Sequence, residues 1–467
     1  MEKDNVKINL TEGKIFGTLL RLGLPIAGVQ VMHMAYNITD MFWLGRVSSA
    51  ALAATGIAGL FIWLSVGLML IGRVGAEVGV AQSRGKGDIK AAYHYSRTAI
   101  YLSAALGILY GSVIFIFRFP LVGLFGFQEI HVVTYTTSYM AIMALGIPTV
   151  FIGSAIDGAF VASGNSRTPF LIGSSGLILN MILTPIFIFT LELGVVGAAF
   201  SSILSQYVVF LIRIVALKHF KSRPFDTYQI MIPFSFSGII SDLHTGISNH
   251  IFKLTLPICL EQTIFPLLTM VTTGFEVDFG SFAVSMSRVG SQIESLSWLV
   301  GAGFGAALTA FVGQNFGAGK MDRISKSVRY SALSLFFWGI FVTAILWFGA
   351  EIIFVVFLPE YVVYPEMRRI FVTYMRILAA CQILANLEYV ASNAFRGKGK
   401  TIPPSVVSIT SNVIRVPLAF FLSLTSLGVL GIWTAVSFTN ALRGLGVCLW
   451  YWWDSRRSCN NTGHVVK

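Results

Sequence analysis

The sequence contains few charged residues for its length. Only 12% of its 467 residues are Asp, Glu, Lys or Arg, whereas 55% are hydrophobic, and the mean hydropathy is +0.76. A water-soluble globule needs more polar surface than this, so the composition excludes that class and indicates an integral membrane protein. The four cysteines have neither paired nor metal-ligand spacing, which argues against a disulfide framework and a structural metal site.

The sequence also lacks a motif for nucleotide binding and a motif for catalysis. Five lysines directly follow a glycine, but none of them has the upstream glycine of a Walker A loop. The seven histidines are scattered, and no nucleophile or metal-ligand constellation is evident. We therefore expect neither an ATP-driven pump nor an enzyme, and we expect no cofactor.

Long apolar segments dominate what the sequence does contain. Each can cross about 30 Å of hydrocarbon as a helix that rises about 1.5 Å per residue. The sequence therefore predicts an all-α integral membrane protein with twelve transmembrane helices. They lie near residues 17–45, 49–82, 91–117, 130–162, 168–190, 195–217, 245–275, 281–314, 327–348, 367–395, 402–424 and 429–453.

The second half of the sequence repeats the first. Residues 24–26 (Leu-Pro-Ile) recur 232 positions later as residues 256–258, and Gln82 recurs in the same way as Gln314. Each half holds six spans, an even number, so the pseudo-two-fold axis between the halves should run along the membrane normal. We expect an N-terminal six-helix lobe over 1–217, a cytoplasmic linker over 218–244, and a C-terminal lobe with a short cytoplasmic tail over 245–467.

Basic residues cluster on alternate connections between the predicted spans. By the positive-inside rule these connections face the cytoplasm, which places both termini there and the chain in the cell membrane. Glu276 and Asp278 are among the acidic residues assigned to the opposite, outer connections. The net charge of +12 has this topological cause, so we expect no nucleic-acid partner.

Asp40 lies inside the first span, where a carboxylate costs at least about 2.5 to 3.5 kcal/mol. His33, Tyr36 and Asn37 precede it at helical spacing and share its face. Pro25, earlier in the same span, removes a backbone hydrogen bond and permits a kink. We expect Asp40 to act as a proton or cation switch on a bendable helix; the alternative is a static bond to neighbouring helices.

The other acids within spans have potential arginine partners. Glu77 follows Arg73 by one helical turn, and a local ion pair between them would leave Asp157 freer to titrate. A carboxylate that a guanidinium holds ionised is a poor proton carrier, so we expect coupling in the first lobe. The second-lobe candidates are Glu261, Glu294 and Glu388, with Arg288 and Arg415 as their neutralising partners.

Four runs of residues together resemble the multidrug and toxic compound extrusion (MATE) family, and most closely its DinF-type branch. They are Leu-Pro at 24–25 with Asp40, VAQSRG at 80–85, NMILTP at 180–185 and VGQNFGAG at 312–319. The resemblance implies two six-helix lobes in a V around a central cavity. It also implies export of cationic amphipathic compounds in exchange for protons or sodium ions. Asp40 would then be the proton or Na⁺ site, aided by Pro25, Tyr36 and Asn180.

Two departures from the family pattern concern its acidic residues. Thr184 stands where a second aspartate is common, whereas Asp157 stands where an asparagine is usual, so the carboxylate has moved from span five to span four. Whether Asp157 replaces the missing charge is open. Glu261 falls about one turn before the position at which the NorM-like branch has a glutamate.

We therefore predict a secondary antiporter, monomeric and surrounded by membrane lipid, that exports amphipathic organic cations. Met32, His33, Asn37 and Ser202 are its candidate cavity residues, and no resident metal is expected. A flippase for lipid-linked precursors is the alternative within the carrier class, and it should have a cavity rich in basic residues. A membrane receptor or channel is the alternative outside that class.

Overall fold

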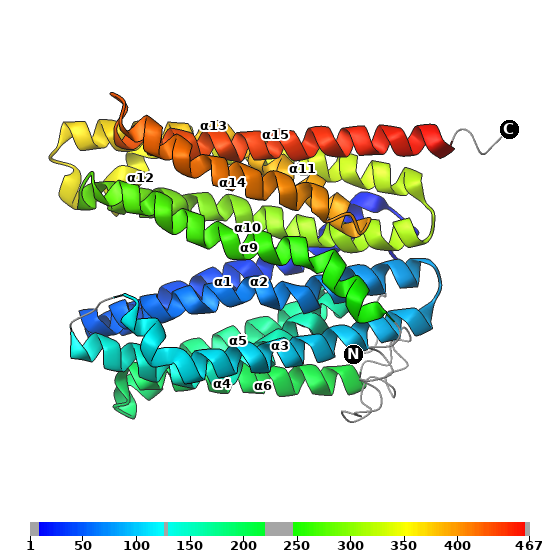
Figure 1. Ribbon diagram of the computed structural model, residues 1–467, viewed down its shortest axis with the longest axis horizontal. Coiled ribbons are helices and arrows are strands. Elements are labelled where there is room, and N and C mark those ends of the chain that lie inside the picture. The colour runs from blue at the N-terminus through cyan, green and yellow to red at the C-terminus, as the bar shows by residue number, and fades with distance from the viewer. Residues whose placement is uncertain (1–8, 126–128, 220–245, 463–467) are drawn as a thin grey trace.

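The computed structural model describes residues 9–125, 129–219 and 246–462, and within these ranges it contains helices and no strand (Figure 1). The first lobe comprises α1 (Ile15–Val47), α2 (Ser49–Gly85), α3 (Ile89–Gly123), α4 (Ile130–Ala162), α5 (Arg167–Pro185), the π-helical turn η1 (Ile186–Thr190) and α6 (Gly194–His219). The second lobe comprises α9 (Ile247–Val277), α10 (Ser281–Gly317), α11 (Met321–Phe348), α12 (Ala350–Phe357), the short 3-10 turn η2 (Pro359–Tyr361), α13 (Pro365–Gly397), α14 (Ile402–Ser423) and α15 (Val429–Thr462).

The predicted spans are confirmed, with boundaries that differ by up to nine residues, and the structure adds the short helix α12. Eleven helices of the described chain are long and apolar enough to cross a membrane. The twelfth, α15, is long enough, but polar residues such as Asn440 and Arg443 lower its hydropathy. It packs against α13 and α14 and lies alongside the other helices of its lobe (Figure 1).

The sequence repeat produces a repeat in structure. Helices α1 and α2 begin at residues 15 and 49, and α9 and α10 begin 232 residues later, at 247 and 281. The helices α1–α6 form one half of the molecule and α9–α15 form the other (Figure 1). Across the boundary, α2 packs on α9 and α10, and α1 packs on α10. The linker predicted at 218–244 lies almost entirely outside the described residues, so its role stays a prediction.

The two lobes are tied together where α2 and α10 end. Gln82 Nε2 donates to the backbone oxygen of Gly397 at 2.9 Å, and Gln314 Nε2 donates to that of Ala162 at 2.6 Å. The two glutamines are repeat equivalents, so each lobe holds the other in the same way. A Cβ added at Gly85 or at Gly317 would overlap a carbonyl group of the opposite helix. The small residues of the VAQSRG and VGQNFGAG runs therefore allow close contact between α2 and α10 and hold the two lobes together here.

The close approach of α2 and α10 gives a test of this tie. Gly85→Ala should push the two helices apart and lower the stability of the purified protein by about 1 to 3 kcal/mol, read as a lower Tm in detergent. Gly59→Ala in the same helix is the matched control, because a Cβ there meets no atom within 4 Å. Equal melting temperatures for the two variants would show that the crossing is not tight.

Candidate functional site

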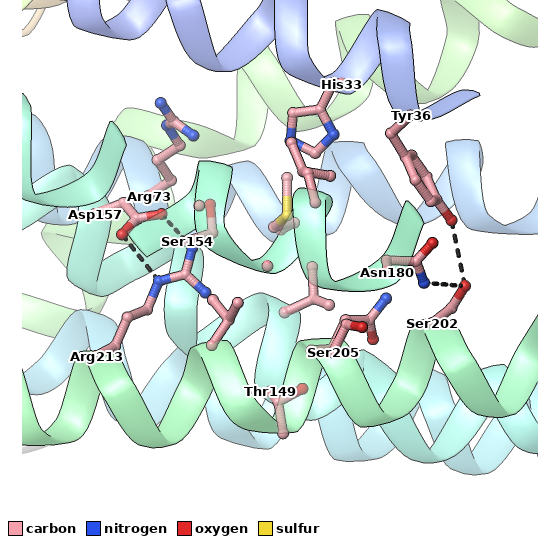
Figure 2. A pocket seen from close by; sticks show the side chains of 17 residues that line it. His33, Tyr36, Arg73, Thr149, Ser154, Asp157, Asn180, Ser202, Ser205 and Arg213 are labelled. Carbon is pink, nitrogen blue, oxygen red and sulfur yellow. Dashed lines mark hydrogen bonds and ion pairs between the residues drawn. The ribbon is translucent and has the colours of Figure 1, made fainter. Parts of the chain in front are cut away.

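A cavity of about 290 Å³ lies within the first lobe, between α1, α2, α4, α5 and α6. Figure 2 shows an ion pair at one end of this cavity and a hydrogen-bonded network at the other. His33 and Tyr36 reach it from α1, and Arg73 reaches it from α2. Its polar lining is completed by Thr149, Ser154, Asp157, Asn180, Ser202, Ser205, Gln206 and Arg213.

The network joins four of the candidates that the sequence identified. Ser202 on α6 contacts the Tyr36 hydroxyl of α1 at 3.3 Å and accepts a hydrogen bond from Asn180 Nδ2 of α5 at 3.1 Å (Figure 2). Thr184 Oγ1 donates to Asn180 Oδ1 at 3.0 Å and also lies 2.9 Å from the Ser201 hydroxyl. Where the family pattern has an aspartate, this chain therefore has a neutral hydroxyl that bonds α5 to α6.

Asp40 lies one helical turn beyond Tyr36 on α1 but does not line this cavity. Its Oδ1 atom is buried and has no hydrogen-bond partner within the described chain. Tyr36 and the buried Tyr139 of α4 lie close enough to interact electrostatically with it. Tyr139 was not identified from the sequence, because its span has no other sign of a site at that position.

Two of the predicted cavity residues lie elsewhere. Of the four residues predicted to line a substrate cavity, His33 and Ser202 line the first-lobe cavity, whereas Met32 and Asn37 do not, and Asn37 is exposed. A helix presents only about one residue in three or four to a given side, so neighbours of a lining residue point away from it.

Asp157, expected to lack a partner if Glu77 pairs with Arg73, instead forms an ion pair with Arg213. Arg213 on α6 donates Nε to Asp157 Oδ1 at 3.0 Å and Nη2 to Oδ2 at 2.8 Å, and both side chains are about 15% exposed or less. The sequence carried this signal, since Arg213 is an arginine within a span. The expected ion pair between Glu77 and Arg73 is absent from the described chain, and Glu77 Oε1 has no hydrogen-bond partner there. Helical spacing alone does not place two side chains in contact.

A second cavity, of about 630 Å³, lies between the lobes and extends into the second lobe. Residues of α1 and α2 contribute one wall, and residues of α9, α10, α13, α14 and α15 contribute the others. Its acidic residues are Glu77, Glu261, Glu276, Glu294 and Glu388, and its basic residues are Arg73, Arg396, Arg415 and Arg443.

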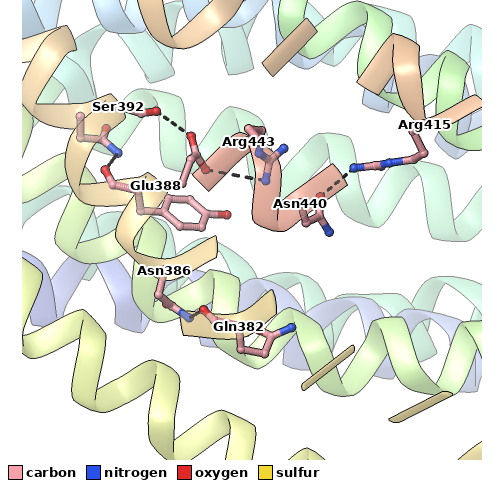
Figure 3. A network of polar contacts seen from close by, with 9 residues as sticks. Gln382, Asn386, Glu388, Ser392, Arg415, Asn440 and Arg443 are labelled. Carbon is pink, nitrogen blue, oxygen red and sulfur yellow. Dashed lines mark hydrogen bonds and ion pairs between the residues drawn. The ribbon is translucent and has the colours of Figure 1, made fainter. Parts of the chain in front are cut away.

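Neither of the two arginines expected to neutralise the second-lobe acids forms an ion pair with one of them within the described residues, although Arg415 lies near enough to Glu294 to interact with it electrostatically. Arg288 is exposed and makes no ion pair within the described residues, and Arg415 donates to Thr439 Oγ1 and Asn440 Oδ1 at 3.0 and 2.7 Å. Instead, Arg443 of α15 lies 3.7 Å from Glu388 Oε2 (Figure 3). Glu388 and Arg443 are far apart in sequence and meet only because α13 packs on α15, which spacing within one helix does not reveal.

The remaining second-lobe acids are hydrogen-bonded to neutral groups. Glu261 Oε2 accepts from Ser405 Oγ at 2.9 Å, and Glu294 Oε1 accepts from Gln382 Nε2 at 2.8 Å. Glu276 was assigned to an outer connection, and that assignment is wrong, because it belongs to the last turn of α9 and is 4% exposed. The sequence therefore missed one buried acid of this cavity.

Comparison with known proteins identifies the family. A family model described as MatE matches residues 25–186 and matches again at residues 257–421, once in each lobe. This chain belongs to the MATE family. It is therefore a multi-pass membrane transporter and not an enzyme. The branch within the family stays a prediction.

Relatives and solved structures cover nearly the whole chain. A Thermotoga maritima protein described as a probable multidrug resistance protein NorM is 24% identical over 421 residues, 89% of this chain and 87% of that protein. The multidrug export protein MepA of Staphylococcus aureus is 20% identical over 428 residues, 90% of each chain. A crystal structure of MATE in the bent conformation superposes with a TM-score of 0.87 at 21% identity, over 97% of this chain and 98% of that one. The MATE fold with its two lobes is thereby confirmed.

The Asp157–Arg213 pair generates a prediction about stability. Asp157→Asn should leave a buried guanidinium without its partner and lower the free energy of unfolding by about 2 kcal/mol or more. The double variant Asp157→Asn with Arg213→Gln should recover part of that loss, because both charges are then gone. Thermal unfolding in detergent measures both effects.

An exposed ion pair in the same protein serves as the control. Glu351 and Arg368 are 2.7 Å apart, but their side chains are 60% and 47% exposed, so Glu351→Gln should change Tm little. If Asp157→Asn is equally silent, the pair in the first lobe contributes no measurable stability.

Proposed function

We propose that this protein exports amphipathic organic cations in exchange for protons or sodium ions, with Asp40 as the coupling carboxylate and α1 bending at Pro25. The named relatives are described as multidrug resistance or export proteins, which supports the substrate class. The proposal includes a monomer in the lipid of the cell membrane with both termini cytoplasmic, in keeping with the basic connections.

The inter-lobe cavity has the size and chemistry for such substrates. Its volume of about 630 Å³ falls within the range of about 300 to 1,000 Å³ that small-molecule sites have. Aromatic side chains from both lobes, including Trp63 and Trp298, line it together with five glutamates. Aromatic faces and carboxylates both attract an organic cation, and they do so most strongly where water is excluded.

The observation that carries the coupling role is the buried oxygen of Asp40 that lacks a hydrogen-bond partner among the residues the structure describes. An ionised carboxylate with such an oxygen is costly in a membrane, so binding a proton or a cation relieves that cost. The Tyr36–Ser202–Asn180–Thr184 network lies one turn away and ties α1 to α5 and α6. A change of charge at Asp40 would therefore act on the contact that holds this part of α1.

The packing of α1 differs on the two sides of Pro25. Before and just after Pro25 the helix is held closely, since a Cβ at Gly28 would lie 2.8 Å from the Phe170 ring, and Gly23 faces the backbone of α10. Five of its six buried residues lie between positions 18 and 26, and only Leu44 is buried after that. The second half of α1 thus has few contacts to break, and Pro25 lies where a bend would begin.

A flippase for lipid-linked precursors is the second candidate, because four arginines line the inter-lobe cavity, more than the sequence indicated. A polyanionic headgroup needs an excess of positive charge. The same cavity holds five glutamates, and Arg443 lies beside one of them, so the balance of charges supports a cationic substrate better.

Asp40→Asn should abolish coupling without preventing folding, because the amide has the size of the carboxyl group but cannot titrate. In proteoliposomes, gradient-driven transport of ethidium should fall at least about tenfold, while binding of ethidium to the purified protein persists. Glu129→Gln, which changes an exposed carboxylate, is the control for expression and net charge. Transport at the wild-type rate by Asp40→Asn would overturn the coupling role.

The repeat supplies a matched control for the hinge. Pro25→Ala restores a backbone donor in α1 and should slow transport several-fold, to about a third or less, with the Kd for ethidium changed little. Pro257→Ala makes the same change at the equivalent position of α9 and should slow transport less. The hinge role is wrong if the second-lobe variant has the larger effect on the transport rate.

A further inference from the structure

Glu276 occupies a buried position at one end of the inter-lobe cavity. It lies in the last turn of α9 and is 4% exposed. Its Oε1 atom accepts two hydrogen bonds of 3.0 Å, one from Ser287 Oγ of α10 and one from Trp433 Nε1 of α15. Its Oε2 atom is buried without a hydrogen-bond partner in the described chain. Three helices of the second lobe therefore enclose this carboxyl group, but only one of its oxygens is satisfied.

No counter-charge compensates an ionised Glu276 within the described residues. Both of its donors are neutral groups, and no Lys or Arg lies within ion-pair distance of it there. Arg443, by contrast, contacts Glu388, and Arg213 contacts Asp157. A buried carboxylate that has neither a cation nor a full set of donors is costly, whereas the neutral carboxylic acid avoids most of that cost.

The titratable and charged groups on the surrounding helices do not alter this balance. The ring of Tyr374 of α13 contacts that of Trp433 at a tilt of 35°, with ring centroids 4.1 Å apart, and its hydroxyl donates to the Ser287 backbone oxygen at 3.3 Å. Among the charged groups on these helices, Asp278, which directly follows α9, and Arg288 on α10 are exposed. Glu294 on α10 is a second acid, and Arg415 on α14 is hydrogen-bonded to α15.

The enclosure also limits what Glu276 can bind. Trp433 and Tyr374 are each 2% exposed, so an organic cation has no open ring face to contact here. A metal cation needs several oxygen ligands, whereas Glu276 offers a single oxygen without a partner. A proton needs one oxygen and no room.

We propose that Glu276 is a proton-binding carboxyl group of the second lobe, with Trp433 hydrogen-bonded to it as a built-in reporter of its protonation state. The group is the carboxylic acid when the cavity is closed around it, with the proton on Oε2, and it loses that proton to water when the cavity opens to solvent. Transport coupling thus involves an acid in each lobe. The use of this proton rests on the proposed antiport, but its binding is a property of the purified protein alone.

Trp433 makes the proposal measurable without transport. The indole Nε1 donates directly to the carboxyl group, so ionisation of Glu276 should alter the emission of Trp433. We would titrate the purified full-length protein over about pH 5 to 9 and subtract the signal of Trp433→Phe to isolate that residue. We expect a single pH-dependent transition in wild type, and we expect Glu276→Gln to remove it.

Infrared difference spectra between neutral and alkaline pH provide the second readout. Wild type should show a carboxylic acid C=O band at neutral pH that Glu276→Gln removes. Asp278→Asn is the matched control, because it changes an exposed carboxylate two residues away, and it should keep both the band and the Trp433 transition. Asp40→Asn should also keep the Trp433 transition, which separates this proposal from the coupling role of Asp40.

Should Glu276→Gln fail to fold, Ser287→Ala tests the same point. Losing one of the two donors to Oε1 destabilises the ionised form, so the transition should move to higher pH by about one unit. The proposal is overturned if the Trp433 transition survives in Glu276→Gln or does not respond to Ser287→Ala. It is also overturned if wild type has no Glu276-dependent acid band at neutral pH.

Discussion

Hydrocarbon offers no hydrogen bonds, and that constraint decides where each polar side chain of this bundle must lie. Most of the buried polar groups find their hydrogen-bond or ion-pair partners within the protein. Asp157 is bonded to Arg213, Glu388 lies beside Arg443, and Thr184 joins α5 to α6. Within the described residues, Asp40, Glu77 and Glu276 each keep one buried oxygen without a hydrogen-bond partner. Such groups cost stability, so they are the places where binding a proton or a cation changes the energy of the protein most.

The duplicated halves have kept their framework and have diverged in their charges. Gln82 and Gln314 are repeat equivalents that make equivalent bonds between the lobes, and Gly85 and Gly317 allow the helices to touch there. At the same offset, Asp40 corresponds to Thr272, and Glu276 corresponds to Leu44. Close packing at one end thus keeps two similar lobes in register, while the acids give each lobe its own chemistry.

The sequence predicted the architecture well, because span length, basic connections and the repeat each depend on local composition. Tyr36, Asn180 and Thr184, named from the sequence as coupling candidates, and Ser202, named as a cavity residue, lie in one hydrogen-bonded network in the structure. Partner assignments failed where they relied on spacing within one helix. Arg213 and Asp157 are 56 residues apart and meet only because α4 packs on α6. Glu276 was missed because a helix end and a connection look alike in sequence, and only packing shows that α10 and α15 cover it.

Ion-gradient-driven transport of an organic cation tests the account most directly. Purified protein would be reconstituted into vesicles with ethidium present, and either a pH gradient or a sodium gradient would be imposed separately. The account predicts that one of the two gradients drives ethidium movement against its own concentration gradient, and that collapsing this gradient with an ionophore stops the movement. Ethidium that only equilibrates, at a rate independent of both gradients, would contradict ion-coupled export.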